Sequence, residues 1–458
     1  MFHRQLGQIC YAIRHFIFKA LMIKTDTPSP SLRNHLIQGA FGSLGLKLSQ
    51  TLLSLVWAVV LARLLGVDGF GIYVFCISIV NLLTIPAMLG GQQLLVREVA
   101  AYNARDELHF LFGLLQRMRQ ATTAASILLS LCAAGVGWWI YQESPLRWPF
   151  LIAMSLIPLI TAMNLQGAVL WGLRHVLLGQ ANRVLLPALC LVLISCISWF
   201  KRPALTPTIA LAAYTASAGL LVIAIHVVVR LVFPKSTTPI KPAYENSRWM
   251  HSMLPFIFSD AMQMLNNETS VVLLGAMMGT EAVGLFRVGQ QGAGLVPFGL
   301  LAVNMAIAPI VAELFAKGEK QRLQHMISRS IIAIMAFAIP VALCLILGGR
   351  WLLPLVFGGQ FAPAYIPMVI LCLGQLVNAC AGSVGLILNM VGLEHLVARG
   401  VAIAALTNVA LNAVLIPFWG PTGAAIASSI SLAIWNVLLA LWLYKKTGIV
   451  SIFRLAKG

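Results

Sequence analysis

Two stretches of the chain, far apart in sequence, carry the same residue pattern. Residues 66–73 read Gly-Val-Asp-Gly-Phe-Gly-Ile-Tyr, and residues 279–286 read Gly-Thr-Glu-Ala-Val-Gly-Leu-Phe. From 66 to 279 the offset is 213, and Gly falls on Gly and acid on acid. Residues 172–175, Gly-Leu-Arg-His, return as Gly-Leu-Glu-His at 392–395, an offset of 220. Two matches in the same order at nearly the same offset indicate a duplication, so we expect two halves of similar fold.

The composition shows that both halves lie in a membrane. Hydrophobic residues make up 60% of the chain and charged residues 10%, and the mean hydropathy is +0.90. A helix needs about 20 mostly apolar residues to cross a bilayer. The sequence offers twelve such stretches: 38–65, 70–90, 120–141, 148–171, 184–200, 206–232, 252–279, 284–311, 330–349, 363–391, 399–417 and 421–444.

These stretches must be helices, because lipid offers the backbone no hydrogen-bond partner. An even number of spans in each half makes the repeats parallel, with the substrate path of such folds at their interface. The predicted fold is therefore an all-α polytopic membrane protein, with twelve transmembrane helices in two parallel six-helix repeats around a central cleft. The expected organisation is a basic cytoplasmic tail at 1–35, a six-helix lobe at 36–232, a cytoplasmic linker at 233–250, a second lobe at 251–444 and a basic cytoplasmic tail at 445–458.

The net charge of +18 reflects topology rather than nucleic-acid binding. With the N-terminus inside, 24 of the 31 Lys and Arg residues fall on inner segments and 5 on outer turns. This bias predicts that both termini are cytoplasmic. Apolar positions in residues 1–24 have the spacing of a helix lying on an anionic inner leaflet, although a basic tail that only sets topology fits equally well.

The sequence carries no sign of a metal site, a cofactor or a nucleotide. The eight cysteines have no metal-ligand spacing and read as buried apolar residues. Neither a P-loop nor a dinucleotide fingerprint is found. We therefore expect no cofactor and no ATP-driven step within this chain.

A few charged residues lie inside the predicted spans, where each costs roughly 3 kcal/mol or more and usually faces a cavity or a partner. The offset of 213 places Asp260 on Lys47 and Gln263 on Gln50. We expect this position to face the central cleft in both halves. The candidate cleft residues are Lys47, Gln50, Asp260, Gln263, Asn267 and Arg287, with Asp260 and Glu268 as candidate carriers of a coupling proton or sodium ion.

Other interpretations of these residues stay open. Lys47 and Asp260 would also fit a structural ion pair that holds the halves together, and Lys47 could reach the inner interface. The amide side chains equally suit hydrogen bonding between helices. The eighth span holds Gly289, Gly292, Gly294 and Pro297, a composition that suits a bending gate beside the cleft as well as close helix packing.

Three further segments carry a resemblance to a known family. They are residues 62–73 at the first outer turn, residues 353–364 (Leu-Pro-Leu-Val-Phe-Gly-Gly-Gln-Phe-Ala-Pro-Ala), and residues 411–427, which contain Ile-Pro-Phe-Trp-Gly-Pro-Thr-Gly-Ala-Ala. With the repeat, they make residues 36–445 resemble the multidrug/oligosaccharidyl-lipid/polysaccharide (MOP) exporter superfamily. Within it, the chain looks like the Wzx-type polysaccharide-biosynthesis flippases.

The resemblance implies a bacterial inner-membrane protein that moves an undecaprenyl-pyrophosphate-linked oligosaccharide from the inner to the outer leaflet. Such transport supplies O-antigen, capsule or exopolysaccharide assembly, and a polysaccharide polymerase and assembly proteins are expected partners. Lys47 and Arg287 would then contact the pyrophosphate, while Gln50, Gln263 and Asn267 would meet sugar hydroxyls.

Competing functions make different demands on the sequence. A cation-coupled drug antiporter of the same superfamily would want acids in its first-half cavity, yet the first span offers Lys47 and no acid. A lipid II flippase usually has two extra helices. A membrane-embedded polymerase or ligase would need a sizeable catalytic outer loop, and the outer turns here are short.

Overall fold

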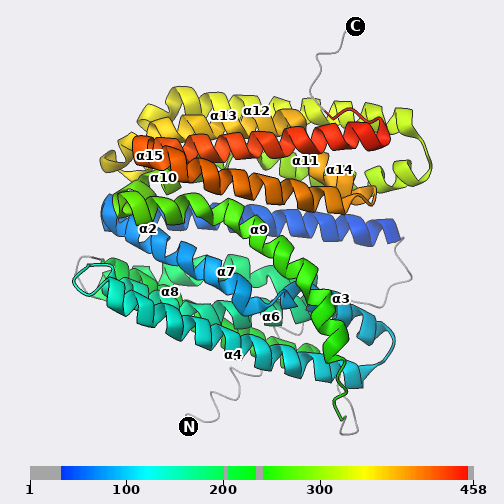
Figure 1. Ribbon diagram of the computed structural model, residues 1–458, viewed down its shortest axis with the longest axis horizontal. Coiled ribbons are helices and arrows are strands. Elements are labelled where there is room, and N and C mark those ends of the chain that lie inside the picture. Colours follow the sequence, from blue (N-terminus) through cyan, green and yellow to red (C-terminus); the bar gives the residue numbers. More distant parts are fainter. Residues whose placement is uncertain (1–31, 201–204, 234–240, 452–458) are drawn as a thin grey trace. The chain divides into compact units, whose positions relative to one another are not determined.

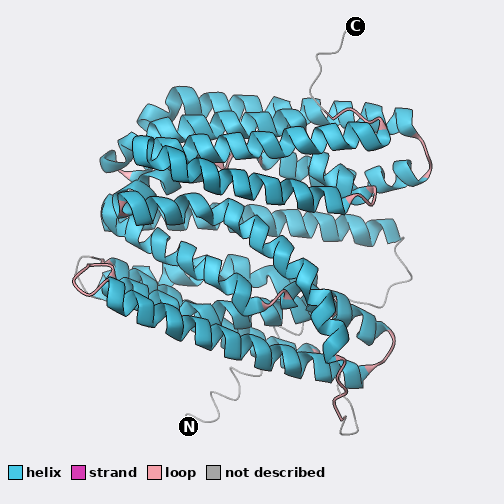
Figure 2. Cartoon of the chain, in the orientation of Figure 1, coloured by secondary structure: helices cyan, strands magenta, loops and turns pink. Residues whose placement is uncertain are grey.

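The structure is a computed structural model that describes residues 32–200, 205–233 and 241–451. Within these ranges the secondary structure is helical and no strand occurs, as Figure 2 shows. The chain divides into two compact units, residues 1–45 and 46–458. Of the first unit, only the start of a long helix belongs to the described residues. The interfacial helix expected in residues 1–24 lies outside them.

Helices of the first half account for the first six predicted spans and add a shorter helix that hydropathy does not reveal. The added helix, α3, continues the chain past the left-handed turn at Leu89 and Gly90. The helix α8 begins with Thr206 as N-cap and proline in its first turn, where a missing N–H costs nothing. The elements are α2 (Leu32–Met88), α3 (Gly91–Ala104), α4 (Leu108–Ile140), α5 (Arg147–Met154), α6 (Leu156–Gly172), α7 (Val176–Phe200) and α8 (Pro207–Val232).

Helices of the second half follow the same up-and-down path. Two predicted spans, 284–311 and 363–391, are each broken into two helices. The elements are α9 (Asn246–Met278), α10 (Thr280–Ala293), α11 (Phe298–Ala316), α12 (Lys320–Phe357), the 3-10 helix η1 (Gly359–Ala364), α13 (Tyr365–Ala381), α14 (Val384–Met390) and α15 (Glu394–Thr447).

The helices confirm the predicted membrane fold. In the part of the chain that the structure describes, nine helical segments are long and apolar enough to cross a membrane. Two of them, in α2 and α15, each contain two predicted spans, separated by breaks at Gly66 and Gly420. The predicted span 252–279 forms α9, whose polar side chains keep it out of that set.

The turns show how closely the two halves repeat each other. Gly66 has φ 70° and ψ −175°, and Gly279 has φ 88° and ψ −177°, so the offset of 213 holds for backbone as well as sequence. The second match holds less well. The residue with positive φ is Arg174 in one half and Gly392 in the other, an offset of 218 rather than 220. The Gly-Leu-x-His match therefore pairs residues that sit two positions apart in the two turns.

Each half forms its own helical bundle within residues 46–458. In the first, α6 packs against α3, α4, α7 and α8, and in the second, α13 packs between α12 and α15 (Figure 1). The long helix α9 packs mainly on α15 and also touches α3 of the first half. Side chains such as Leu61, Phe286 and Leu371 fill a core that draws on both halves.

We name the two ends of this bundle by what lies there. The Gly66 end holds the turn at Gly66, the turn at Gly279 and η1, while the linker end holds residues 241–245 and the start of α9. At the Gly66 end, Thr280 Oγ1 donates to Asp68 Oδ1 at 3.3 Å, and Arg63 Nε donates to the Val356 carbonyl at 2.7 Å. The two halves are therefore joined at this end.

Candidate functional site

A cavity of about 340 Å³ lies where the first half meets α10 of the second half. Its wall comes mostly from both arms of α2 on either side of Gly66, because the break folds the helix back on itself. The polar residues in the wall are Gln50, Ser54, Ser78 and Asn81 of α2, Asn164 of α6, Asn182 and Arg183 of α7, and Arg287 and Gln291 of α10.

Two arginines give this cavity a positive charge. Arg183 comes from α7 and Arg287 from α10, so each half supplies one guanidinium. Lys47 lies one turn before Gln50, and its Nζ donates to Gln50 Oε1 at 3.5 Å. Among the described residues that line the cavity, none is a carboxylate. The described lining therefore holds two guanidinium groups and no acid to balance them.

Aromatic side chains form another part of the wall. Trp57 Nε1 donates to the Tyr73 hydroxyl at 3.0 Å, and both side chains are buried. Tyr73 also meets Tyr214 edge to face, with ring centroids 6.3 Å apart. These contacts fix rings that present an apolar face and a polar edge to whatever enters.

One amide in the wall is poised for a ligand. The side chain of Asn182 is 4% exposed, and its Oδ1 has no hydrogen-bond partner among the described residues. A buried polar atom without a partner costs free energy that a bound hydroxyl or amide recovers. Asn182 and Arg183 stand next to each other on α7, so they can offer a neutral and a charged contact together.

The structure places the predicted cleft residues in three groups. Gln50 and Arg287 line the cavity, and Lys47 contacts it through Gln50. Asp260 instead accepts a hydrogen bond from Gln93 Nε2 of α3 at 2.8 Å, away from this wall. Within the described residues, Lys47 and Asp260 do not form an ion pair. The two remaining residues, Gln263 and Asn267, are exposed on α9 and do not line the cavity.

Glu268 stands directly behind the cavity wall. Its side chain is 6% exposed, and its Oε1 accepts from Asn81 Nδ2 at 3.1 Å. Asn81 itself lines the cavity, so this contact connects α9 to the wall. The second oxygen, Oε2, is buried and has no partner in the described structure. The role of Glu268 as a carrier of a coupling proton or sodium ion stays a prediction.

The predicted gate helix is broken where the prediction expected it to bend. α10 ends at Ala293 and α11 begins at Phe298, with Gly294 and Pro297 in the break. Gly289 and Gly292 are packed against Met368 of α13, where a Cβ on Gly292 would lie 2.8 Å from the sulfur. These two glycines serve close helix packing, and the gating role stays a prediction.

Arg183 is a cavity residue that the sequence interpretation missed. The predicted span 184–200 begins directly after it, so the hydropathy pattern leaves Arg183 outside the span. The helix starts earlier, at Val176, so Arg183 lies two turns inside it. Positions i, i+3 and i+4 share one helix face. This spacing places Arg183 on the same face of α7 as its neighbours in the wall, Asn182, Leu186 and Pro187.

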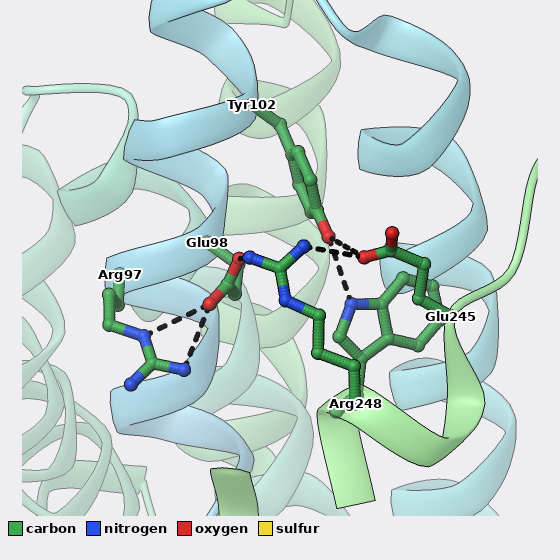
Figure 3. A network of polar contacts seen from close by, with 6 residues as sticks. Arg97, Glu98, Tyr102, Glu245 and Arg248 are labelled. Carbon is green, nitrogen blue, oxygen red and sulfur yellow. Dashed lines mark hydrogen bonds and ion pairs between the residues drawn. The ribbon is translucent and has the colours of Figure 1, made fainter.

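A second polar contact joins the halves at the linker end (Figure 3). Glu98 of α3 is 4% exposed and contacts Arg97 Nη2 at 2.9 Å and Arg248 Nη2 at 3.7 Å. Glu245 accepts from the Tyr102 hydroxyl at 2.9 Å and contacts Arg248 at the same distance. Burial raises the pKa of Tyr102, so its hydroxyl keeps the proton that it donates. This network ties α3 to the first turn of α9.

Comparisons with known proteins identify the family and the fold of the chain. The family model described as "Polysaccharide biosynthesis protein" matches residues 36–315, more than half of the chain, and the MatE model matches residues 255–414. The probable low-salt glycan biosynthesis flippase Agl15 of Haloferax volcanii is 26% identical over 186 residues. That stretch covers 40% of this chain and 39% of Agl15, so the chain spans well under half of the length of this relative.

Two solved structures share the fold. The inward-facing conformation of a multidrug resistance MATE family transporter of the MOP superfamily has a TM-score of 0.67 at 14% identity, covering 87% of this chain and 96% of that one. The lipid II flippase MurJ in its inward closed conformation has a TM-score of 0.61 at 13% identity, covering 87% and 86%. The chain belongs to the polysaccharide biosynthesis protein family, and it is a multi-pass membrane protein with the twelve-helix fold of the MOP transporter superfamily.

Proposed function

We propose that the protein is a flippase that turns an anionic lipid-linked oligosaccharide, carried on undecaprenyl pyrophosphate, from one membrane leaflet to the other. The observation that carries this proposal is the cavity with Arg183 and Arg287 in its wall and no carboxylate among its described lining residues. A pyrophosphate bears more than one negative charge, so guanidinium groups from opposite sides suit it. The polar amides and hydroxyls of the wall suit the sugar.

The physical demand of the task explains why such a cavity is needed. A glycan hydroxyl or a phosphate in hydrocarbon costs several kcal/mol when it has no partner. A polar cavity replaces those lost contacts, while the prenyl chain stays in the lipid beside the protein. Lys47, close to Gln50 at the edge of the wall, would meet the substrate before or after the two arginines.

The family relationship supports this substrate class. The matched family is described by polysaccharide biosynthesis, and the curated relative is a probable glycan biosynthesis flippase. O-antigen, capsule or exopolysaccharide assembly would use the product, with a polymerase and assembly proteins as partners.

We propose that the substrate moves from the inner to the outer leaflet, and the topology determines which end of the protein faces the cytoplasm. The linker belongs to the predicted inner segments, which hold 24 of the 31 Lys and Arg residues, so the linker end would face the cytoplasm in a bacterial inner membrane. Reporter fusions within residues 142–146 should then report outside, and fusions within 235–245 should report inside. A cytoplasmic signal from 142–146 would contradict this orientation of the protein in the membrane.

The decisive experiment follows the lipid-linked repeat unit in a strain that lacks this protein. The repeat unit should accumulate on the inner leaflet, protected in spheroplasts from an externally added glycosidase, and surface polysaccharide should fall. A plasmid copy should reverse both effects. If the repeat unit is digested from outside, a later step such as polymerisation is missing and the proposal is wrong.

A cation-coupled antiporter is the second candidate, and one observation favours it. Glu268 is a buried carboxylate with a free oxygen, directly behind the cavity wall. If this acid binds a cationic drug or its coupling ion, the protein would lower the susceptibility of cells to lipophilic cations. Unchanged inhibitory concentrations of such compounds in the deletion strain, together with accumulated repeat unit, would leave the flippase as the only function of the two.

A further inference from the structure

A second cavity lies within the first half, and α10 contributes no residue to its described lining. Its volume is about 450 Å³, larger than that of the cavity described above. α4, α6 and α8 form its walls, and Pro242 of the linker lies at its mouth. Neither the proposed transport step nor any sequence motif uses these residues.

Three polar side chains of this cavity lie at one depth. Arg119 lies about 20 residues from the Gly66 end of α4, Gln166 about 20 residues from the start of α5, and His226 about 20 residues from the start of α8. At a rise of 1.5 Å per residue, about 20 residues span the roughly 30 Å hydrocarbon core. The three side chains therefore stand at the edge of the hydrocarbon, next to the headgroup layer that holds the lipid phosphates.

The positive charge of Arg119 lines the cavity, and His226 adds ring nitrogens that can contact an anion. Arg119 and His226 are among its lining residues, and none of the described lining residues is an acid. Within the described ranges, Arg119 has no ion-pair partner. A guanidinium at this depth is favourable only with an anion beside it or water around it.

Deeper in the cavity, a buried hydroxyl lacks a partner. Thr161 is 2% exposed, and its Oγ1 makes no hydrogen bond to any described residue. It lies five residues before Gln166 on α6, which is about 7 Å further into the membrane. In a phospholipid, the ester oxygens also lie on the hydrocarbon side of the phosphate, and they accept hydrogen bonds that a threonine can donate.

The outer face of α4 continues from the cavity into the hydrocarbon. Thr123 lines the cavity, and Ile127 and Leu131 follow it at four-residue steps on the same face. Ile127 is 46% exposed and Leu131 is 66% exposed, so this row offers an apolar track for acyl chains.

We propose that this cavity binds one anionic glycerophospholipid from the leaflet at the linker end. Arg119 and His226 hold its phosphate, Thr161 donates to an ester oxygen, and the acyl chains follow Ile127 and Leu131. The positive lining selects an anionic headgroup over a zwitterionic one, because none of the described lining residues is a carboxylate that could meet an ammonium group.

The test measures lipid binding to the purified full-length protein. The protein is delipidated in dodecyl maltoside, and dioleoyl phosphatidylglycerol or dioleoyl phosphatidylcholine is added in steps. Native mass spectrometry counts bound lipids, and the melting temperature follows stabilisation. We expect one phosphatidylglycerol to bind at least tenfold more tightly than phosphatidylcholine. The variant Arg119→Ala should lose about tenfold in phosphatidylglycerol affinity, because it removes the charged contact to the phosphate.

Controls separate this site from general attraction to a basic surface. Arg230→Ala removes a charge from α8 one turn after His226 and outside the lining, so it should bind phosphatidylglycerol as the wild type does. Arg119→Lys keeps the charge and should retain part of the affinity. Thr161→Val should weaken binding without a change of charge. Each variant is compared at a lipid-free melting temperature close to that of the wild type.

Three results would overturn the proposal. The first is equal binding of the two lipids, and the second is unchanged phosphatidylglycerol affinity in both Arg119→Ala and Thr161→Val. The third is equal stabilisation by millimolar inorganic phosphate, which would assign the site to a free anion. Because none of these measurements uses transport, their outcome is independent of the proposed flippase function.

Discussion

Gly71 and Gly284 face each other across the two halves of the protein and occupy equivalent positions in the repeat. A Cβ on Gly71 would lie 3.2 Å from the Gly284 nitrogen and would overlap the carbonyl oxygen of Thr280. A Cβ on Gly284 would lie 3.4 Å from the Gly71 nitrogen and 2.6 Å from the carbonyl oxygen of Val67. Val67 and Thr280 are equivalent as well, since both pairs are 213 residues apart. The duplicated motif thus forms a two-fold crossing at the Gly66 end.

This crossing predicts that a side chain at either glycine disturbs the packing of α2 against α10. The substitution Gly71→Ala should force α2 and α10 apart, because backbone atoms on the other side cannot move independently. We expect the variant to lose about 1–3 kcal/mol of stability, which is the usual cost of overpacking. Transport should fall severalfold while the protein still inserts. Surface polysaccharide and the melting temperature of the purified protein measure the two effects.

The matched control is Gly135→Ala on α4. Nothing lies within 4 Å of a Cβ at this position, so the substitution should be neutral or slightly stabilising. If Gly71→Ala and Gly284→Ala both behave as Gly135→Ala does, the close crossing is dispensable for transport.

The three cations of the proposed substrate cavity should each matter for transport. We expect Arg183→Ala and Arg287→Ala to lower surface polysaccharide at least tenfold at equal protein levels, since each loses a charge-assisted contact to phosphate worth about 1.5–3 kcal/mol. Lys47→Ala should have a smaller effect, because its ammonium reaches the cavity through Gln50. Accumulated lipid-linked repeat unit, measured in membrane extracts, should rise in the same order.

Charge-matched variants complete this test. Arg183→Lys and Arg287→Lys keep the charge but lose the planar fork, so they should retain partial transport. Arg329→Ala removes an exposed arginine of α12 outside the cavity and should transport normally. Normal export by the double variant Arg183→Ala/Arg287→Ala would show that these charges serve structure alone.

The sequence predicted the fold well because hydropathy and the repeat each determine it independently. Long apolar runs must be helices in lipid, and the glycine turns at Gly66 and Gly279 keep the same backbone conformation. What it did not predict were the features that depend on contacts between segments. α3 is too polar for a hydropathy window, and the shift of two positions between the turns at Arg174 and Gly392 leaves no trace in a motif match.

The candidate site was predicted less completely, for a physical reason. Pseudo-symmetry placed Asp260 on Lys47, but side chains at equivalent positions need not share a cavity when the halves differ in their neighbours. Gln93 of α3 holds Asp260, while Gln50 holds Lys47. Arg183 was missed because a charge at the edge of an apolar stretch is assigned to water, although the helix continues past it.

The contact between α3 and α9 predicts a difference between buried and exposed ion pairs. Glu98→Gln removes a buried carboxylate that meets two arginines, so we expect a loss of about 1–3 kcal/mol in stability. Arg97 and Arg248 are half exposed, so water replaces part of the contact that each guanidinium loses. Glu319→Gln breaks the exposed pair with Arg322 and should cost about 0–1 kcal/mol. Thermal unfolding of both variants in detergent measures the difference, and equal shifts would contradict it.

The last prediction concerns Glu268, the buried acid that we propose as the carrier of a coupling ion. Glu268→Gln keeps the shape of the side chain and its acceptor for Asn81, but it removes the charge that a proton or sodium ion would neutralise. In proteoliposomes, the wild type should translocate a labelled polyprenyl-pyrophosphate glycan faster under a proton or a sodium gradient. We expect Glu268→Gln to lose this dependence while its glycan affinity stays within about twofold, because the carboxylate lies behind the wall rather than in it. Asp260→Asn removes the other intramembrane acid, which is hydrogen-bonded to Gln93, and should keep the gradient dependence. If the two variants exchange behaviours, the coupling ion binds at Asp260. If both keep the response of the wild type, neither carboxylate carries the ion.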